Sequence, residues 1–506
     1  MKTNYKPIIT KDIEDMHPKN VLSESDVYFA HLARKILSEL SRNKLIDADF
    51  SGCLRDISLK SAVYFEDLIS GLGLFAGLRK MHGQMFGKKL PFFILGSDYL
   101  DDEINIEDLQ FLIWIIMQKP ANEIDNFRLL NVEKPEIVTV ASTVMNILEK
   151  EYETAPENET LHNMLHEHVY SDFSEFRSIL EWLYYGSYLS TTHPNLALLD
   201  GVKKLLKRFD DHHIPLVKEK FMSSWKLNRI FDPGCTPLTV KATDWWKAIT
   251  GNSEILNILD KVEYRTTAYY RIKNLKDAAV KVSPLLNDME MLDMDCNSFR
   301  GRTDGKGKKT IYTTLVKFKD LWQANGFMLF VDNESEILKG LKEKEEKEEL
   351  DRKNILFTYE QMMDCTGNRP LLFFKTFDKW IDFWKRSFPY VRNIEEIHTD
   401  EMKAEKNLAV FVNQTSGVTA VPDAAPLIKA PDNKLYDREV AEKQGIALLC
   451  GAIQTPLEML EYVIENNMLP DVKLNSPKGE AHSRQLVQDN MRFIVRFFQP
   501  ELFNNS

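Results

Sequence analysis

The spacing of apolar residues predicts that the first half of the chain is helical. Behind a cap at Ser25 or Asp26, apolar residues recur every three or four positions: Phe29, Ala33, Ile36, Leu37 and Leu40. A second helix is predicted from about 59 to 81, with a break or a close crossing at its glycines, Gly71, Gly73 and Gly77. The segment 109–117 is apolar on all sides, and Asp172 with Glu175 predicts another helix start. Helical patterning continues to about residue 260.

The pattern changes near Val262, where β-branched and aromatic residues form short runs. These runs are TTAYYRI, AAVKV, KTIYTTLVKF and GFMLFV, separated by Gly, Asn and Asp. They predict a small β-rich unit over 261–332. The following residues, 333–354, are highly charged and lack an apolar stripe after Leu341, which is typical of a solvated helix or a flexible connector. We therefore expect a domain boundary there.

The last third, 355–506, mixes strand and helix signals. Strands are predicted at ILFTYEQMM and LLFF, followed by a helix with Phe377 and Trp384 on one face. LAVFV and VTAV flank NQTSG and predict a hairpin, and Asp437 is typical of a helix cap. A C-terminal helix is expected around 484–498. The predicted fold is α+β and mostly α: a helical domain (1–260), a β-rich unit (261–332), a charged connector (333–354) and an α+β domain (355–506).

Composition and charge exclude several classes of protein. The chain has 506 residues, of which 43% are hydrophobic and 28% charged, as in ordered globular proteins of more than one domain. A net charge of −11 disfavours a broad nucleic-acid surface. Five scattered cysteines without a CxxC pair disfavour a disulfide framework or a thiolate zinc site. The first residues lack an apolar leader and no apolar run is long enough for a membrane span, so we expect a cytoplasmic protein.

The clearest anomaly is a concentration of histidine. Six of the eleven fall within 52 residues: His162, His166, His168, His193, His212 and His213. If 160–170 is helical, one face carries Glu159, His162 and His166, and HxxxH spacing lets two imidazoles reach one ion. His213 would complete this predicted metal site from a second segment. The alternative, favoured because no HExxH motif is present, is that these histidines are solvated or bonded within the fold.

A basic, glycine-rich loop, RGRTDGKGKK, is a candidate contact for phosphates or nucleic acid. It supplies Arg300, Arg302, Lys306, Lys308 and Lys309. It is not a phosphate-binding Walker loop, because no Gly-Lys-Ser or Gly-Lys-Thr stands at the required spacing. Given the opposing net charge, a solvated loop is the alternative that we favour.

Carboxylates gather next to the most apolar helices, at Glu66, Asp67, Asp101, Asp102, Glu103, Glu107 and Asp108. If buried together they would suit acid–base or Mg²⁺ chemistry. Acids at helix starts, however, commonly oppose the helix dipole. No nucleophile motif is present, so the sequence assigns no catalytic residue and leaves any cofactor open.

Two segments carry a family resemblance. The stretch YFEDLISGLGLFAGLRKMHGQMFGKKLPFF, followed by DYLDDEINIEDLQFLIWIIM, resembles an uncharacterised family from Bacteroidetes, a domain of unknown function. The late segment FVNQTSGVTAVPDAAPLIKAPDNKLYDREVAEKQGIALL is similar to the C-terminal part of that family. The resemblance implies a cytoplasmic bacterial protein with a helical and then mixed layout. It implies no catalytic residue, cofactor or substrate.

Well-patterned cores without a complete catalytic motif favour a non-enzymatic protein that binds another protein, such as an adaptor. One alternative is a metal-dependent hydrolase that uses Glu159, His162, His166 and His213. The other is a nucleic-acid-binding protein that uses the basic loop 300–309. Whether the protein is an enzyme stays open at this point.

Overall fold

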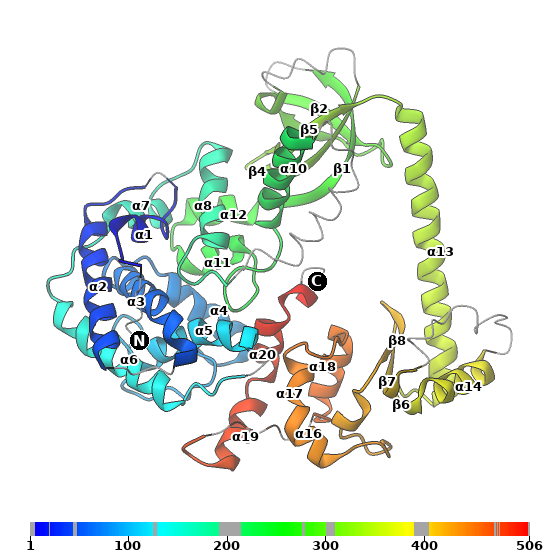
Figure 1. Ribbon diagram of the computed structural model, residues 1–506. Coiled ribbons are helices and arrows are strands. Elements are labelled where there is room, and N and C mark those ends of the chain that lie inside the picture. The colour runs from blue at the N-terminus through cyan, green and yellow to red at the C-terminus, as the bar shows by residue number, and fades with distance from the viewer. Residues whose placement is uncertain are drawn as a thin grey trace.

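The computed structural model shows a mostly helical α+β protein with a small barrel at one end (Figure 1). The structure describes residues 6–503 except 20, 44–47, 125–128, 192–213, 276–278, 300–308, 389–403, 470–471, 473 and 475. Within these residues no single helix has the length and apolar composition of a membrane span. One pair of consecutive helices, Phe50–Ile69 and Leu74–Phe86, has this length and composition when the two are taken together, but the chain bends by 87° between them.

The N-terminal half is a helical body, as predicted. Its helices are α1 (Thr10–Glu14), α2 (Ser25–Asn43), α3 (Leu54–Ile69), α4 (Leu74–Phe86), α5 (Ile106–Ile124), α6 (Pro135–Leu148), α7 (Glu159–His166), α8 (Phe173–Tyr185), α10 (Ile214–Arg229), α11 (Ala242–Ile249) and α12 (Ser253–Asp260). The apolar segment 109–117 lies in α5, and all of its apolar residues are buried. Asp172 caps α8 by accepting hydrogen bonds from the backbone N–H groups of Ser174 and Glu175.

The glycines after α3 produce both a break in the helix and a close helix crossing, the two effects that the sequence predicts as alternatives. Gly71 and Gly73 have φ angles of +57° and +76°, which L side chains rarely adopt, and they turn the chain between α3 and α4. Gly77 lies against α11, since a Cβ atom at this position would come within 2.8 Å of the Ile249 side chain. The predicted helix over 59–81 is therefore two helices that meet at a sharp corner.

The β-rich unit is a closed five-stranded barrel. Its strands are β1 (Glu263–Leu275), β2 (Ala279–Pro284), β3 (Leu292–Asp295), β4 (Thr310–Phe318) and β5 (Leu321–Val331). They are ordered β1-β2-β3-β5-β4, with β4 pairing back onto β1. The contact between β3 and β5 is parallel, and the long β1 pairs with both β2 and β4. This order and this closure are those of the OB-fold, a small Greek-key barrel.

A polar joint attaches the barrel to the helical body. Asn325 on β5 accepts a hydrogen bond from Arg177 of α8 (3.1 Å) and donates to the Leu227 carbonyl of α10 (3.0 Å). An apolar contact lies beside it, with the rings of Phe176 and Phe318 centred 5.0 Å apart. Because Asn325 is fully buried, these hydrogen bonds fix the barrel in one orientation on the body.

The charged segment 333–354 is helical. It forms the first part of α13 (Glu334–Thr366), a 33-residue helix that runs from the barrel to the C-terminal sheet (Figure 1). Its middle is exposed and carries ion pairs one turn apart, such as Lys344–Glu348 (3.5 Å). The strand predicted at 355–363 is wrong, because these residues continue α13. The predicted domain boundary stays a prediction.

The C-terminal part pairs a three-stranded sheet with short helices. The elements are β6 (Leu371–Thr376), α14 (Phe377–Ser387), β7 (Lys406–Asn413), β8 (Gly417–Val421), α16 (Arg438–Gln444), α17 (Ile446–Leu449), α18 (Leu457–Glu465), α19 (Glu480–Gln488) and α20 (Met491–Phe498). The predicted hairpin is β7–β8, and Asp437 caps α16. The single helix expected over 484–498 is instead divided between α19 and α20.

Helix α20 returns to the N-terminal body. Phe493 and Phe497 place their ring centroids 6.2 Å and 4.9 Å from that of Trp114 on α5. Asn490 accepts a hydrogen bond from the backbone N–H of Phe92 (2.9 Å). The last helix of the chain is thus part of the same hydrophobic core as the first helices.

Candidate functional site

Buried polar residues gather around α3, the helix at the centre of the N-terminal body. This helix buries Glu66 and Asp67, two of the carboxylates singled out by the sequence. Neighbouring residues on a helix point about 100° apart. Each carboxylate therefore enters a different cluster.

Glu66 belongs to a cluster with His17 and Asp26, the three side chains being at most 2% exposed. His17 Nε2 lies 2.9 Å from Glu66 Oε2, and His17 Nδ1 lies 3.3 Å from Asp26 Oδ1. Asn158 donates to the other Glu66 oxygen at 2.8 Å. One imidazole is thus held between two carboxylates.

These charges decide the protonation of His17. Burial alone lowers the pKa of His17, but the charge of Glu66 and the hydrogen bonds of both carboxylates outweigh it and raise the pKa to about 9. The ring is therefore an imidazolium at neutral pH. Three ligand-type atoms of His17, Asp26 and Glu66 lie within 4.8 Å of one another, a spacing that suits a metal ion. Because a metal ion binds imidazole in its neutral form, a proton on His17 and an ion at this position exclude each other.

The Asp67 carboxylate accepts three hydrogen bonds within the described part of the chain. It accepts hydrogen bonds from the backbone N–H groups of Leu74 and Phe75 (2.9 Å each) and from the Tyr188 hydroxyl (2.6 Å). Burial raises its pKa in spite of these bonds. The first turn of α4 thereby gains an acceptor for two of its free N–H groups.

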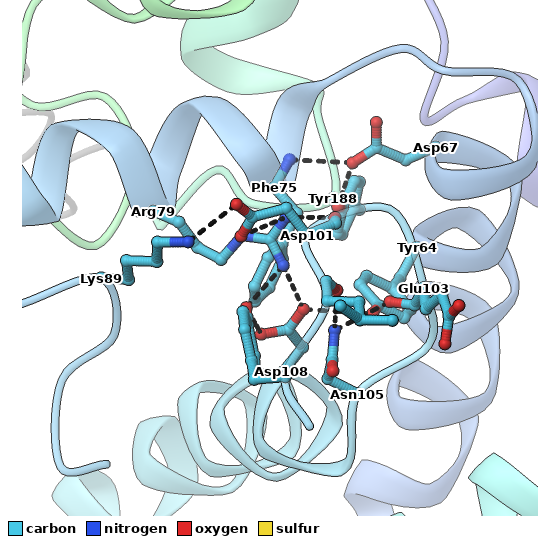
Figure 2. A network of polar contacts seen from close by, with 12 residues as sticks. Tyr64, Asp67, Phe75, Arg79, Lys89, Asp101, Glu103, Asn105, Asp108 and Tyr188 are labelled. Atoms are coloured by element: carbon cyan, nitrogen blue, oxygen red, sulfur yellow. Dashed lines mark hydrogen bonds and ion pairs between the residues drawn. The ribbon is translucent and has the colours of Figure 1, made fainter. Parts of the chain in front are cut away.

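Arg79 forms the third cluster, which Figure 2 shows from close by. Its guanidinium donates to Asp108 (2.7 Å), to the Tyr99 hydroxyl (2.5 Å) and to the Asp101 carbonyl (2.6 Å). Tyr99 and Tyr64 donate to Asp108 at 2.8 Å and 3.3 Å. Burial raises the pKa of Asp108 to about 6, although the Arg79 charge and both tyrosines act against the rise. The Asp108 side chain is 1% exposed, so its geometry favours a structural role.

The predicted metal ligands lie at the edge of these clusters. Glu159 is exposed at the start of α7, and His162 and His166 are half-buried on that helix. His162 Nδ1 is 2.9 Å from the Ser70 carbonyl, and His166 Nε2 is 3.0 Å from the Leu72 carbonyl. Burial lowers the pKa of His166. His213 lies outside the described residues, so the predicted four-residue site stays a prediction.

Asn158, which caps α7, is fully buried, while Glu159 and Thr160 that follow it are exposed. In the basic loop, Arg300, Arg302, Lys306 and Lys308 are outside the described residues, and Lys309 is exposed at the start of β4. The sequence missed His17, because its partners are 9 and 49 positions away on other elements and share no motif with it.

The first prediction concerns pH. The pKa of His17 is about 6.5 in an unfolded chain and about 9 in the folded one, so the folded state holds one more proton between these values. The stabilisation is full below about pH 6.5 and is lost as pH rises through 9, by up to roughly 3 kcal/mol. Urea unfolding at pH 6, 7.5 and 9 should show this loss. The loss of stability between pH 6 and 9 should be much smaller in His17→Gln and unchanged in the control His168→Gln. The same loss in His17→Gln as in the unchanged protein would contradict the protonation of His17.

The second prediction concerns Arg79. Asp108→Leu leaves the guanidinium buried with its main charge partner gone, and should lower the free energy of unfolding by about 3–5 kcal/mol. The double variant Arg79→Met/Asp108→Leu should be more stable than Asp108→Leu alone. As a control, Lys89→Met removes an exposed partner of Asp101 and should change stability by less than about 1 kcal/mol. A double variant no more stable than Asp108→Leu would argue against a buried ion pair.

Comparisons with known proteins complete the description. No curated protein matches the chain, and no solved structure matches it. A family model described as "Protein of unknown function (DUF3843)" matches residues 7–307 and 316–499, which is nearly the whole chain. The resemblance seen in the two sequence segments therefore extends over both the helical body and the C-terminal part, and the chain belongs to this family of unknown function.

Proposed function

We propose that this protein is a non-enzymatic binding protein, such as an adaptor, that holds another protein at the β2–β3 loop of its barrel. One observation carries the proposal. Leu286, Met289 and Met291 are 45%, 91% and 46% exposed within six consecutive residues. Large apolar side chains grouped on a surface are typical of protein contacts, and methionine adapts its shape to different partners.

The charge around this loop indicates the chemistry of the partner. Residues 285–295 contain four acidic side chains and neither lysine nor arginine, and three of the acids pair with basic residues of neighbouring strands: Asp288 with Arg271, Glu290 with Arg265 and Asp293 with Lys281. Such partly exposed pairs are weak, so a cationic partner can compete for the acids, and a complementary segment would combine large apolar side chains with Lys or Arg. The loop belongs to the barrel at one end of the molecule, where α10 packs against β5 and α13 follows β5 in the chain (Figure 1).

The buried clusters support binding over catalysis. The oxygens of Glu66, Asp67 and Asp108 accept hydrogen bonds from His17, Asn158, Tyr188, Arg79 and their neighbours within the chain. A catalytic acid or base must reach a substrate proton directly or through one water. These carboxylates are instead used to hold helices together.

A peptide library displayed on phage and panned against the immobilised full chain tests the proposal. We expect enrichment of peptides that combine large apolar residues with Lys or Arg. Leu286→Ser/Met289→Ser/Met291→Ser should weaken their binding at least ~10-fold, which is about 1.4 kcal/mol.

The matched control is Leu350→Ser/Phe357→Ser, which removes similarly exposed apolar side chains from α13 and should bind as the unchanged protein does. Equal binding by the loop variant, or enrichment of acidic peptides, would refute the proposal.

A second candidate is nucleic-acid binding by the barrel. The OB-fold order of its strands favours it, because such barrels bind oligonucleotides in many proteins. Residues 262–332 also carry twelve Lys and Arg against nine Asp and Glu, in a chain whose net charge is −11. It ranks second because barrel cations pair with acids, as in Arg265–Glu290 and Lys281–Asp293 (3.2 Å).

A fluorescent single-stranded oligothymidylate tests this candidate by anisotropy. Binding should appear at low salt and weaken steeply as salt rises. Replacing Arg300, Arg302, Lys308 and Lys309 by Gln should reduce it, whereas Lys344→Gln/Lys347→Gln on α13 should not. Absence of binding at low salt would end this candidate.

A further inference from the structure

Two histidines of α7 each have one ring nitrogen fixed by a backbone carbonyl. His162 Nδ1 faces Ser70 O at 2.9 Å, and His166 Nε2 faces Leu72 O at 3.0 Å. A carbonyl oxygen only accepts hydrogen bonds, so each of these nitrogens carries a proton, and in the neutral form that a metal ion requires the lone pair is on the other nitrogen. The lone pairs are then on His162 Nε2 and His166 Nδ1. Among the described residues no hydrogen bond to His162 Nε2 is present, and the His166 ring also lies near the Gly71 carbonyl, beside that of Leu72.

This pattern is the one that metal-binding histidines show. A ligating imidazole generally donates its other N–H to a carbonyl or a carboxylate, which fixes its tautomer and orientation. The two residues are one helical turn apart, and their ring centroids are separated by 4.7 Å with 32° between the planes. Side chains four residues apart on a helix are neighbours on one face, so HxxxH spacing lets two imidazoles reach one ion.

The neighbouring turn explains why the carbonyls are available. Gly71 and Gly73 take left-handed conformations between α3 and α4, and both lie beside the imidazoles. A Cβ atom at Gly71 would be 3.7 Å from His162 Nδ1, and one at Gly73 would be 4.0 Å from His166 Cε1. The backbone therefore contacts the rings closely, while their half-buried position leaves one side open to solvent.

We propose that His162 and His166 form a two-histidine chelate for a divalent transition-metal ion such as Cu²⁺, Ni²⁺ or Zn²⁺. Neutral imidazole nitrogens are preferred ligands of these ions, with the tightest binding for Cu²⁺. The exposed Glu159, three residues before His162, is a further carboxylate near the pair in sequence. The site is on α7 and is independent of the barrel surface proposed above for a protein partner.

The test is a calorimetric titration of the metal-free full chain with NiCl₂ and with ZnCl₂. We expect one ion per chain. His162→Asn and His166→Gln keep an amide N–H in place of the nitrogen that donates to the carbonyl but remove the lone-pair nitrogen. Each should weaken binding by at least ~10-fold.

His168→Gln is the matched control, since His168 is in the same segment but is 52% exposed and lies beside Glu175 (3.7 Å). It should bind metal as the unchanged protein does. No binding at millimolar metal would overturn the proposal, and so would full-strength binding by His162→Asn and His166→Gln.

A second measurement needs no variant and covers the case in which a substitution impairs folding. Diethyl pyrocarbonate modifies accessible histidines, and mass spectrometry locates the modified residues. Added Zn²⁺ should protect His162 and His166 and leave His168 and His482 reactive. Protection of all four histidines alike, or of none, would contradict a specific chelate.

Discussion

The fold depends on one constraint, which is that the polar groups of a buried helix need partners inside the protein. Helix α3 places Tyr64, Glu66 and Asp67 within the core. An unpaired carboxylate there would cost several kcal/mol, so each recruits donors from other segments. The α1–α2 connection, α4, α5, α7 and the Tyr188 segment are all tied to α3 in this way. The polar contacts thereby specify how the helices are arranged, while the apolar contacts around them supply stability.

Most of the fold could be predicted from local signals. Apolar periodicity located α2 and α5, turn glycines located the corner between α3 and α4, and β-branched runs located four of the five barrel strands. The short strand β3 was not predicted, because its sequence LDMD alternates apolar and acidic residues and contains no β-branched residue. The strand predicted at 355–363 was wrong. Its Ile, Phe and Tyr favour a strand locally, but helix α13 continues through these residues. Barrel closure depends on pairing between distant strands, which no local pattern contains.

The candidate sites were also predictable only where their residues lie within one helix or strand. The HxxxH spacing on α7 and the acids beside α3 were visible, because they lie within single elements. The His17 cluster joins residues from three elements, and the carbonyls that fix His162 and His166 come from a turn about 90 residues earlier. Sequence spacing could thus nominate the ligands. Only the folded chain gives the tautomers, because these depend on which atom faces each ring nitrogen.

Helix α13 joins two parts of the molecule that are each also attached to the N-terminal body. The barrel at its start is fixed to α8 and α10, and the sheet at its end packs through Phe411 and Tyr462 onto helices that share the N-terminal core. Its 33 residues correspond to about 50 Å at 1.5 Å each. Because every residue also adds about 100° of rotation, losing one would twist the barrel out of register with its own docking site. Insertions or deletions in this helix are therefore tolerable only in steps near whole numbers of turns. The positions of the barrel and of the C-terminal sheet thus determine the length of α13.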